Sequence, residues 1–225
     1  MQSERASLEE LTRTPYVQVL TYPRISLREA KSRVKQLAKL GVDKLVFEGH
    51  ARVGRLGILG LGTVRIASMA NRVGVGPEIF AHTRDMILMK LLESQELGVW
   101  LSKLSGRGKR LEAKTMVHGL LNQCRKLDIM GIDHGQLSNL RKHAVVAEGK
   151  PWIIDFESAG TERRPRNVTT AAQYLFVGGA LSPALRRTFG VTETEALKKL
   201  LADYKHDLSD YSYSKILEHL RLTDS

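Results

Sequence analysis

Apolar residues recur at intervals of three and four along much of the chain, and this spacing predicts amphipathic helices. The clearest case runs from Leu27 to Leu40. Ser26 stands at its N-cap, with Glu29 three residues later, which is the spacing of a capping box. Residues 65–71 are expected to form the last part of another helix. Further helices are expected at 96–104, 111–127, 169–177, 183–189, 192–204 and 213–220. The second half of the chain is therefore predicted to be mostly helical.

Short apolar runs bounded by turn residues predict strands. Residues 144–147 and 152–154 flank the turn Glu148-Gly149-Lys150-Pro151, which predicts a hairpin. Residues 78–82 and 86–89 are expected to form an antiparallel pair, and further strands are expected at 45–47 and 56–59. Residues 1–24 are predicted to be an irregular or short-helical lead-in. Taken together, the pattern predicts an α+β fold.

The charge balance indicates a polyanionic partner. The 225 residues include 35 Lys and Arg against 24 Asp and Glu, a formal net charge of +11. Such an excess raises the affinity for nucleic acid, because each phosphate contact releases counterions. The alternative is that the protein is simply basic, as some cytoplasmic proteins are.

Several features predict a cytoplasmic protein with no membrane partner. No apolar run approaches the roughly 20 residues of a membrane span. The first residues lack the basic and then apolar pattern of a signal peptide. Cys124 is the single cysteine, which excludes an internal disulfide and favours a reducing compartment. Its place in an apolar helical pattern predicts a packed thiol.

Ionisable and amide side chains gather around the predicted hairpin. Asp133, His134, Gln136 and Asn139 precede its first strand, and Asp155 ends its second. Carboxylate and amide oxygens suit magnesium and the phosphates that accompany it. The alternative interpretation is a surface hairpin with ordinary turn residues.

These loops resemble those of a known superfamily. The sequences HGQL at 134–137 and IIDFE at 153–157 resemble the catalytic and metal-binding loops of protein-kinase-like enzymes, in the atypical RIO-like branch where the loops read His-Gly-Asp-Leu and Ile-Asp-Phe-Gly. Within that branch the chain resembles the archaeal RNA kinases, which phosphorylate a ribose 2′-hydroxyl in tRNA. The shared residues are DHGQLS at 133–138, DFESA at 155–159 and VGVGP at 73–77.

The resemblance implies a two-lobed, protein-kinase-like fold of RIO type with a mostly helical C-lobe. The implied domains are an N-terminal helical extension at 1–44, an N-lobe at 45–93 and a C-lobe at 94–225. A kinase carries a lysine on the strand after its glycine-rich loop, paired to a helix glutamate. Here no lysine occurs between Lys44 and Lys90, and no glutamate occurs between Glu48 and Glu78. We therefore expect a truncated N-lobe, and we do not expect Arg65 to replace the lysine.

The resemblance also implies ATP and Mg²⁺ as cofactors. Asp155 would be the magnesium ligand and Asn139 a second ligand, although the family spacing would place that ligand at Arg141. The residues expected to bind ATP are those of the glycine-rich loop and of the segment joining the lobes: Gly60, Gly62, Thr63, Met89 and Leu91.

The catalytic loop departs from the family at one position. Gln136 stands where the family has an aspartate, and an amide can hydrogen-bond an acceptor hydroxyl but cannot act as a base. Asp133 is the first candidate for orienting the nucleophile. His134 is the second, because a histidine near neutral pKa can take a proton.

Basic side chains in two segments are candidates for RNA contact, since guanidinium groups pair with phosphate. These are Arg107, Lys109, Arg110, Arg163, Arg164 and Arg166. A solvated surface is the alternative for them. The same choice holds for the basic positions of the helix at 27–40.

The function expected from residues and resemblance is ATP-dependent phosphorylation of a ribose 2′-hydroxyl within tRNA. One alternative is a RIO-type serine/threonine protein kinase. A second is a catalytically impaired, RNA-binding pseudokinase, which the missing lysine favours.

Overall fold

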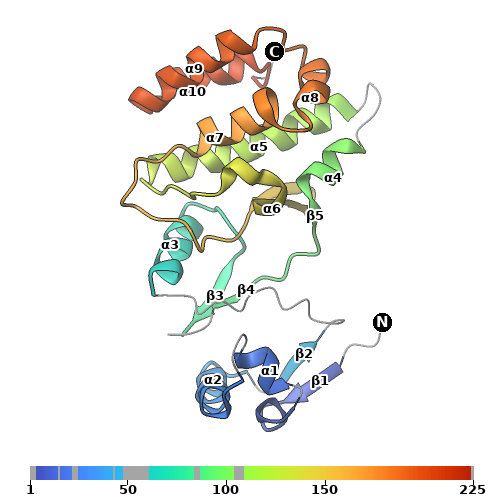
Figure 1. Cartoon of the computed structure of the whole chain (residues 1–225), viewed down its shortest axis with the longest axis vertical. Coiled ribbons are helices and arrows are strands. Elements are labelled where there is room, and N and C mark those ends of the chain that lie inside the picture. The colour runs from blue at the N-terminus through green and yellow to red at the C-terminus, as the bar shows by residue number, and fades with distance from the viewer. Residues whose placement is uncertain are drawn as a thin grey trace. The chain divides into compact units, whose positions relative to one another are not determined.

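The computed structural model describes residues 4–14, 16–21, 25–42, 44–47, 61–83, 87–103 and 109–223. The chain divides into two compact units, one of residues 1–64 and 79–89 and the other of residues 65–78 and 90–225. Helices dominate, and the strands of the described residues form three small antiparallel sheets (Figure 1). The predicted α+β fold class is confirmed.

The first unit begins with a strand that the sequence pattern does not predict. β1 (Glu4–Ser7) pairs antiparallel with β2 (Lys44–Phe47). The prediction of an irregular lead-in is therefore wrong for these four residues, because pairing with β2 and not local alternation makes them a strand. The sheet also joins residues from either side of the predicted division at 44 and 45.

Two helices and a 3₁₀ turn complete the core of the first unit. They are η1 (Glu10–Thr12), α1 (Tyr16–Thr21) and α2 (Leu27–Lys39). The core residues are Ala6, Leu11, Val17, Leu20, Ala30 and Leu37. The predicted cap of α2 is confirmed, since the Ser26 hydroxyl accepts a hydrogen bond from the Glu29 amide at 3.3 Å. The antiparallel pair predicted upstream of residue 90 is also confirmed, as β3 (Ile79–His82) and β4 (Ile87–Met89).

Helix α3 (Leu61–Arg72) replaces part of the predicted glycine-rich loop. Gly62 and Thr63 lie in its first turn, so the prediction of a glycine-rich loop is wrong for the backbone of these two residues, while their contact with ATP stays a prediction. The apolar residues Val64, Ile66, Ala67 and Ala70 are buried, and this helical spacing outweighs the conformational freedom of Gly62. Gly60 and the strand predicted at 56–59 lie outside the described residues.

The second unit contains a three-stranded sheet with the order β5-β6-β7. Its strands are β5 (Gln95–Glu96), β6 (Ala144–Ala147) and β7 (Lys150–Ile153). The predicted hairpin is confirmed, with a tighter turn than expected. Glu148 and Gly149 take φ values of 53° and 72°, so these two residues alone reverse the chain.

The helices of the second unit pack around α5 (Lys109–Ile129), which contacts α7, α8 and β7. Cys124 lies fully buried in α5, as predicted. In Figure 1, α9 and α10 lie side by side, and α7 contacts α9. The other elements are α4 (Leu97–Ser102), η2 (Leu137–Asn139), α6 (Leu140–His143), α7 (Asn167–Gln173), the π-helical η3 (Tyr174–Gly178), α8 (Ser182–Phe189), α9 (Thr194–Asp207) and α10 (Asp210–His219). In the part of the chain that the structure describes, no helix combines the length and apolar character needed to cross a membrane.

Candidate functional site

The two polar loops predicted around the hairpin lie side by side in the second unit. The Asp133 amide donates to the Gly160 carbonyl at 2.9 Å, and the Gly160 amide donates back to the Asp133 carbonyl at 3.0 Å. This pair of main-chain bonds fixes the loop that contains Asp133 and His134 next to the loop that begins at Asp155. The structure thus brings together residues that are more than twenty positions apart in the sequence.

His134 joins the two loops through its side chain. Its Nε2 lies 3.0 Å from the carbonyl oxygen of Ile154, the residue before Asp155. Because a carbonyl only accepts hydrogen bonds, Nε2 must carry the proton. The ring is fully buried and packs against Phe156, with the ring centroids 5.1 Å apart. Burial lowers the pKa of His134 to about 4. This arrangement favours a structural role for His134 over proton transfer at neutral pH.

Asp133 is buried and paired with an arginine from the second loop. Its Oδ2 lies 3.0 Å from Nε of Arg163, whose Nη2 also donates to the carbonyls of Asp133 and Ser158. The Arg163 side chain is half exposed, whereas that of Asp133 is only 3% exposed. Asp133, the first candidate for orienting a nucleophile, is therefore already paired with a cation. Because Arg163 is half exposed, a substrate anion can reach it.

Gly135 is shaped by the same contacts. It has a φ of +84°, and a Cβ there would lie 2.7 Å from Nη2 of Arg163 and 2.8 Å from the Ser158 carbonyl oxygen. Both the backbone conformation and the close approach require glycine. The glycine of the His-Gly pair thus leaves room for the ion pair of Asp133 with Arg163.

Asp155 presents a half-exposed carboxylate at the end of the hairpin. Its Oδ2 lies 3.5 Å from Nδ1 of His143, which is buried. The backbone of Asp155 is left-handed, with a φ of 67°, a conformation that is uncommon outside glycine and is tolerated best by Asp and Asn. Among the described residues, no group of three or more His, Cys, Asp or Glu side chains could hold a metal ion. A cation at Asp155 would therefore take most of its ligands from phosphate and water, as magnesium does in many nucleotide sites.

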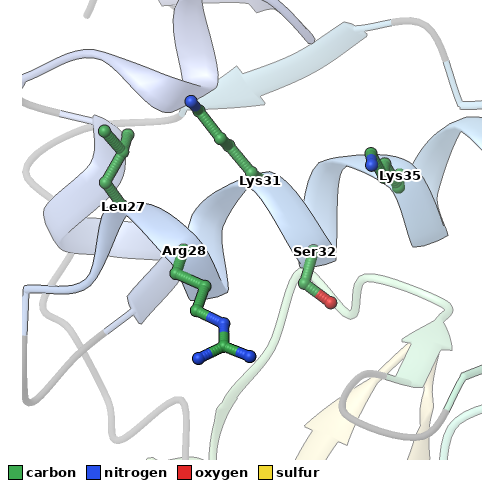
Figure 2. Close-up of a pocket in the computed structure, with 5 residues that line it drawn as sticks. All are labelled: Leu27, Arg28, Lys31, Ser32 and Lys35. Carbon is green, nitrogen blue, oxygen red and sulfur yellow. The ribbon is translucent and has the colours of Figure 1, made fainter.

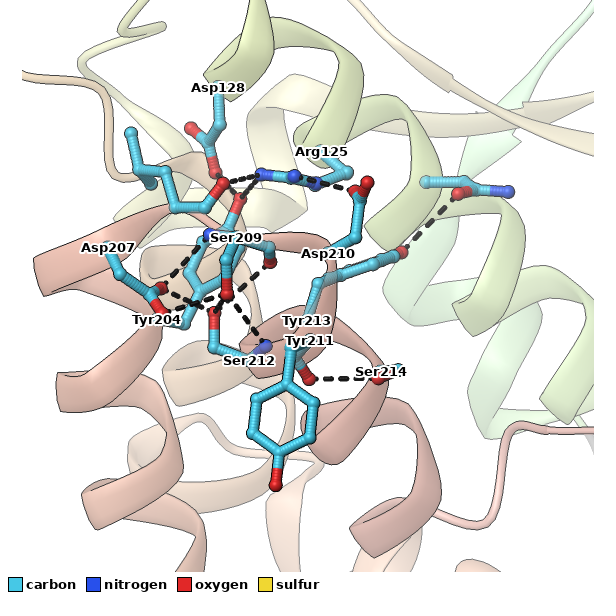
Figure 3. Close-up of polar contacts among 12 residues, drawn as sticks. Arg125, Asp128, Tyr204, Asp207, Ser209, Asp210, Tyr211, Ser212, Tyr213 and Ser214 are labelled. Atoms are coloured by element: carbon cyan, nitrogen blue, oxygen red, sulfur yellow. Dashed lines mark hydrogen bonds and ion pairs between the residues drawn. The ribbon is translucent and has the colours of Figure 1, made fainter.

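A buried polar network contacts the loop that contains Asp133 and His134, and its residues Asp128, Tyr204 and Arg125 are drawn in Figure 3. The Asp128 carboxylate accepts hydrogen bonds from the amides of Asn167 and Val168, from the Asn167 side chain and from the Tyr204 hydroxyl, at 2.7–3.1 Å. Asn167 in turn donates to the Ile132 carbonyl and accepts from the His134 amide. Asn167 therefore links Asp128 to Ile132 and His134, the residues on either side of Asp133.

Arg125 extends this network to the C-terminal helices. It donates to the Tyr204 hydroxyl and to the Leu208 carbonyl, and it forms an ion pair with Asp210 at 2.8 Å. Its guanidinium also lies over the rings of Tyr204 and Tyr213. Helices α9 and α10 are thereby tied to α5 directly behind the candidate site.

The other residues predicted to bind cofactors or to take part in catalysis differ in their burial and in their contacts. The Gln136 side chain has a buried Oε1 with no hydrogen-bond donor among the described residues, and Asn139 is exposed where α6 begins. Arg141, the alternative position for the second metal ligand, pairs with Glu96 at 3.1 Å. Met89 and Leu91 are exposed apolar residues, at 45% and 77%. Their predicted contact with adenine stays a prediction, as do the metal role of Asn139 and the hydroxyl contact of Gln136.

The predicted RNA-contacting cations differ in their surroundings. Arg163 bonds Asp133 and Ser158, and Arg164 donates to the His206 carbonyl. Lys109 and Arg110 donate to the carbonyls of Lys103 and Phe189. Arg166 is exposed at the start of α7, and Arg107 lies outside the described residues. Their contact with RNA stays a prediction.

Sequence reasoning missed three residues of the site. Asp128 and Asn167 form the buried support, and His143 faces Asp155. A carboxylate on the buried, largely apolar face of a helix, as Asp128 is in α5, is a usable signal for a buried polar partner. Nothing in the sequence identifies Asn167 as that partner.

About half of the chain is similar in sequence to an archaeal protein. No protein-family model matches the sequence. Among curated proteins, the chain is similar to an uncharacterized protein of Methanocaldococcus jannaschii, with 29% identity over 119 residues. The aligned region is 52% of this chain and 98% of that protein. The similarity links the chain to an archaeal sequence without adding a function.

The lowered pKa of His134 predicts a pH-dependent stability. The unfolded chain binds a proton on this histidine below about pH 6.5, whereas the folded protein does so only below about pH 4. The contribution of neutral His134 to the free energy of unfolding should therefore be fully present above pH 6.5. It should be lost as the pH drops towards 4, which lowers the free energy of unfolding by up to roughly 3 kcal/mol. Urea unfolding at several pH values measures this.

The control for this prediction is His134→Gln, which keeps an N–H donor for the Ile154 carbonyl but does not titrate. The free energy of unfolding of this variant should change less between pH 6.5 and 4 than that of the wild type. Equal slopes for the two proteins would contradict the assignment to His134.

The crowding at Gly135 predicts a destabilising effect of one added methyl group. Gly135→Ala should lower the free energy of unfolding by about 2–3 kcal/mol, through a strained positive φ and through collision with Arg163 and Ser158. Gly131→Ala is the matched control, because Gly131 has a φ of +70° but no atom within 4 Å of the added Cβ. Thermal unfolding of both variants separates the two effects. An equal loss in both would leave strain as the only cause.

Proposed function

We propose that this protein is an ATP- and magnesium-dependent RNA kinase that places a phosphate on a ribose 2′-hydroxyl within tRNA, in a two-lobed kinase-like fold. The observation that carries the proposal is the joining of two loops with the sequences of a kinase catalytic loop and metal-binding loop. Their main chains pair at Asp133 and Gly160, and His134 bridges to Ile154 directly before Asp155. Two such loops held side by side supply the acidic groups that phosphoryl transfer requires.

The side chain of Asp155 fits the role of magnesium ligand. It is half exposed, carries a carboxylate and stands at the rim of the hairpin on a backbone fixed by Phe156, which is buried against His134. When bound, magnesium would neutralise charge on the transferred phosphate. Nδ1 of His143 lies 3.5 Å from one oxygen of Asp155, so the other oxygen would be free for the ion.

Asp133 is the residue that we assign to orienting the acceptor hydroxyl. Because its carboxylate is paired with Arg163, an incoming phosphodiester would compete with Asp133 for the guanidinium. Binding of the RNA backbone would then free the carboxylate next to the acceptor oxygen. Gln136, whose buried Oε1 has no hydrogen-bond donor among the described residues, would accept a hydrogen bond from the ribose.

RNA is favoured as the substrate over protein by charge. The chain carries a formal charge of +11, and three arginines follow the metal-binding loop within seven residues of Gly160. A substrate with a phosphate at every nucleotide uses this excess, whereas a serine side chain does not.

The experiment that tests the function locates the transferred phosphate. The full chain is incubated with γ-labelled ATP, magnesium and archaeal tRNA, and the RNA is then treated with phosphatase and alkali. Phosphatase that removes only terminal phosphate should leave the label. Alkali should fail to cleave the labelled linkage, because the 2′-oxygen that attacks the phosphodiester is blocked.

Two outcomes would replace the proposal with another function. Label in protein alone, without need of RNA, would indicate a RIO-type serine/threonine kinase. Retention of tRNA with no transfer would indicate an RNA-binding pseudokinase, which is the result expected if the missing lysine abolishes ATP binding.

A further inference from the structure

Helix α2 of the first unit has two chemically different faces. Ala30, Arg33 and Leu37 are buried, and Arg33 donates to the Leu20 carbonyl, so this face belongs to the core. The opposite face lines a hollow of about 490 Å³. Its lining residues are Leu27, Arg28, Lys31, Ser32 and Lys35.

The cations of this hollow have no ion-pair partner among the described residues. Arg28, Lys31 and Lys35 form no ion pair with any carboxylate there, and none of the described residues that line the hollow is a carboxylate. Elsewhere the protein does pair its surface lysines, as with Lys198 and Glu195 at 2.6 Å. Three like charges at spacings of three and four on one helix repel each other, so an anionic ligand would relieve this repulsion.

The spacing of the cations suits an extended anion more than a single phosphate. Arg28 and Lys35 are seven residues apart, which is about 10 Å along a helix. Figure 2 shows Arg28 and Ser32 pointing to one side of α2 and Lys31 pointing to the other, with Lys35 one turn further on. A helix with cations on both sides can contact phosphates on the two strands that border a groove.

A duplex stem of RNA has the matching chemistry. Proteins bind such stems largely through phosphates and 2′-hydroxyl groups, without reading the base sequence. The Ser32 hydroxyl can exchange hydrogen bonds with either group. None of the described residues that line this hollow is aromatic, so they offer no ring on which an unpaired base could stack, which disfavours single-stranded RNA as the ligand.

We infer that the face of α2 formed by Arg28, Lys31, Ser32 and Lys35 is an RNA-binding surface for the backbone of a double-stranded stem. This surface belongs to the first unit, and it shares no residue with the candidate functional site. The inference rests on the proposed function in one respect only, since tRNA is the stem-containing substrate proposed there. The role of this surface is to hold the substrate and not to take part in transfer.

The test measures binding of the full chain to a fluorescent RNA hairpin stem and to a single-stranded RNA of the same composition, without ATP, at several salt concentrations. The variant is Arg28→Ala/Lys31→Ala/Lys35→Ala. Alanine has a high helix propensity at exposed helix positions, so the variant should fold like the wild type. Circular dichroism checks this. The control removes the same charge from exposed positions of α9, as Lys198→Ala/Lys199→Ala/Lys205→Ala.

The expected result is at least a tenfold loss of affinity for the stem in the α2 variant. The slope of log affinity against log salt should become shallower by roughly 2 to 3, because three phosphate contacts are lost. The control should keep both the affinity and the slope. Unchanged stem binding by the α2 variant, an equal loss in the control, or an equal loss on single-stranded RNA would each overturn the inference.

These outcomes are distinguishable from a failure of the proposed function. A chain that binds the stem through α2 but transfers no phosphate to RNA would contradict the kinase proposal and leave this surface in place. If the wild type phosphorylates RNA and the α2 variant binds the stem as tightly as the wild type, the kinase proposal stands and the inference about α2 is wrong.

Discussion

Asp155→Asn is expected to lower phosphate transfer to tRNA by roughly a thousandfold under the proposed function, because it removes the negative charge to which we assign magnesium binding. The substitution is nearly isosteric. Asparagine also tolerates the left-handed backbone at this position, where φ is 67°. The fold should therefore survive, and the loss should appear in the rate of transfer and not in the melting temperature. Single-turnover transfer from γ-labelled ATP measures it.

Glu157→Gln is the matched control for this prediction. Glu157 is an exposed carboxylate two residues further along the same loop, so its change removes the same charge close to the site. It should lower the rate by much less than Asp155→Asn does. Equal losses in the two variants would show that general negative charge in the loop, and not the Asp155 carboxylate, supports transfer.

Asp128→Ala is expected to lower the free energy of unfolding by about 3–5 kcal/mol. The change would leave the Asn167 side chain, two main-chain amides and the Tyr204 hydroxyl without the acceptor that they share in a buried site. Because Asn167 also holds the Ile132 carbonyl and the His134 amide, the loop that contains Asp133 and His134 should loosen as well. Urea unfolding gives the first effect, and hydrogen exchange at the His134 amide gives the second.

Two further variants sharpen this test. Asp128→Asn keeps one acceptor oxygen but turns an N–H towards existing donors, so its effect should be smaller than that of alanine. Asp203→Ala, on an exposed position of α9, should change the free energy of unfolding by no more than about 0.5 kcal/mol. A small effect of Asp128→Ala would contradict the assignment of the network as the support of the site.

The sequence predicts the helices well where apolar spacing is regular. The helix expected at 27–40 is found as Leu27–Lys39, and that expected at 111–127 is found within Lys109–Ile129. The hairpin around residues 148 and 149 and the pair formed by β3 and β4 were also predicted. In each case a local signal, such as a cap, a turn or a period, is sufficient to specify the element.

The errors arise where long-range pairing decides the structure. Strand β1 exists because it pairs with β2, and the paired residues Arg5 and Val46 are 41 positions apart in the sequence. Gly62 was expected in a loop because of its freedom, yet the buried positions of α3 place it in a helix. Local sequence cannot weigh such contacts, since it does not contain the partner.

The candidate site was predictable in its residue types but not in its connections. The sequence singled out Asp133, His134 and Asp155 as the polar residues that flank a hairpin. It did not predict that Arg163 would pair with Asp133, or that His143 would face Asp155. The Asp128 and Asn167 pair joins residues 39 positions apart, and neither belongs to a recognisable motif. Networks of this kind depend on tertiary packing and become visible only in the fold.

The most direct test of the proposed function is transfer of the γ-phosphate of ATP to bulk archaeal tRNA, comparing the wild type with Asp155→Asn under identical conditions. The predicted result for the wild type is label inside the RNA chain that a phosphatase acting only on terminal phosphate does not remove, and almost no label for the variant. Absence of label from RNA with the wild type, or equal labelling by Asp155→Asn, would contradict the assignment of this site as a metal-dependent RNA kinase.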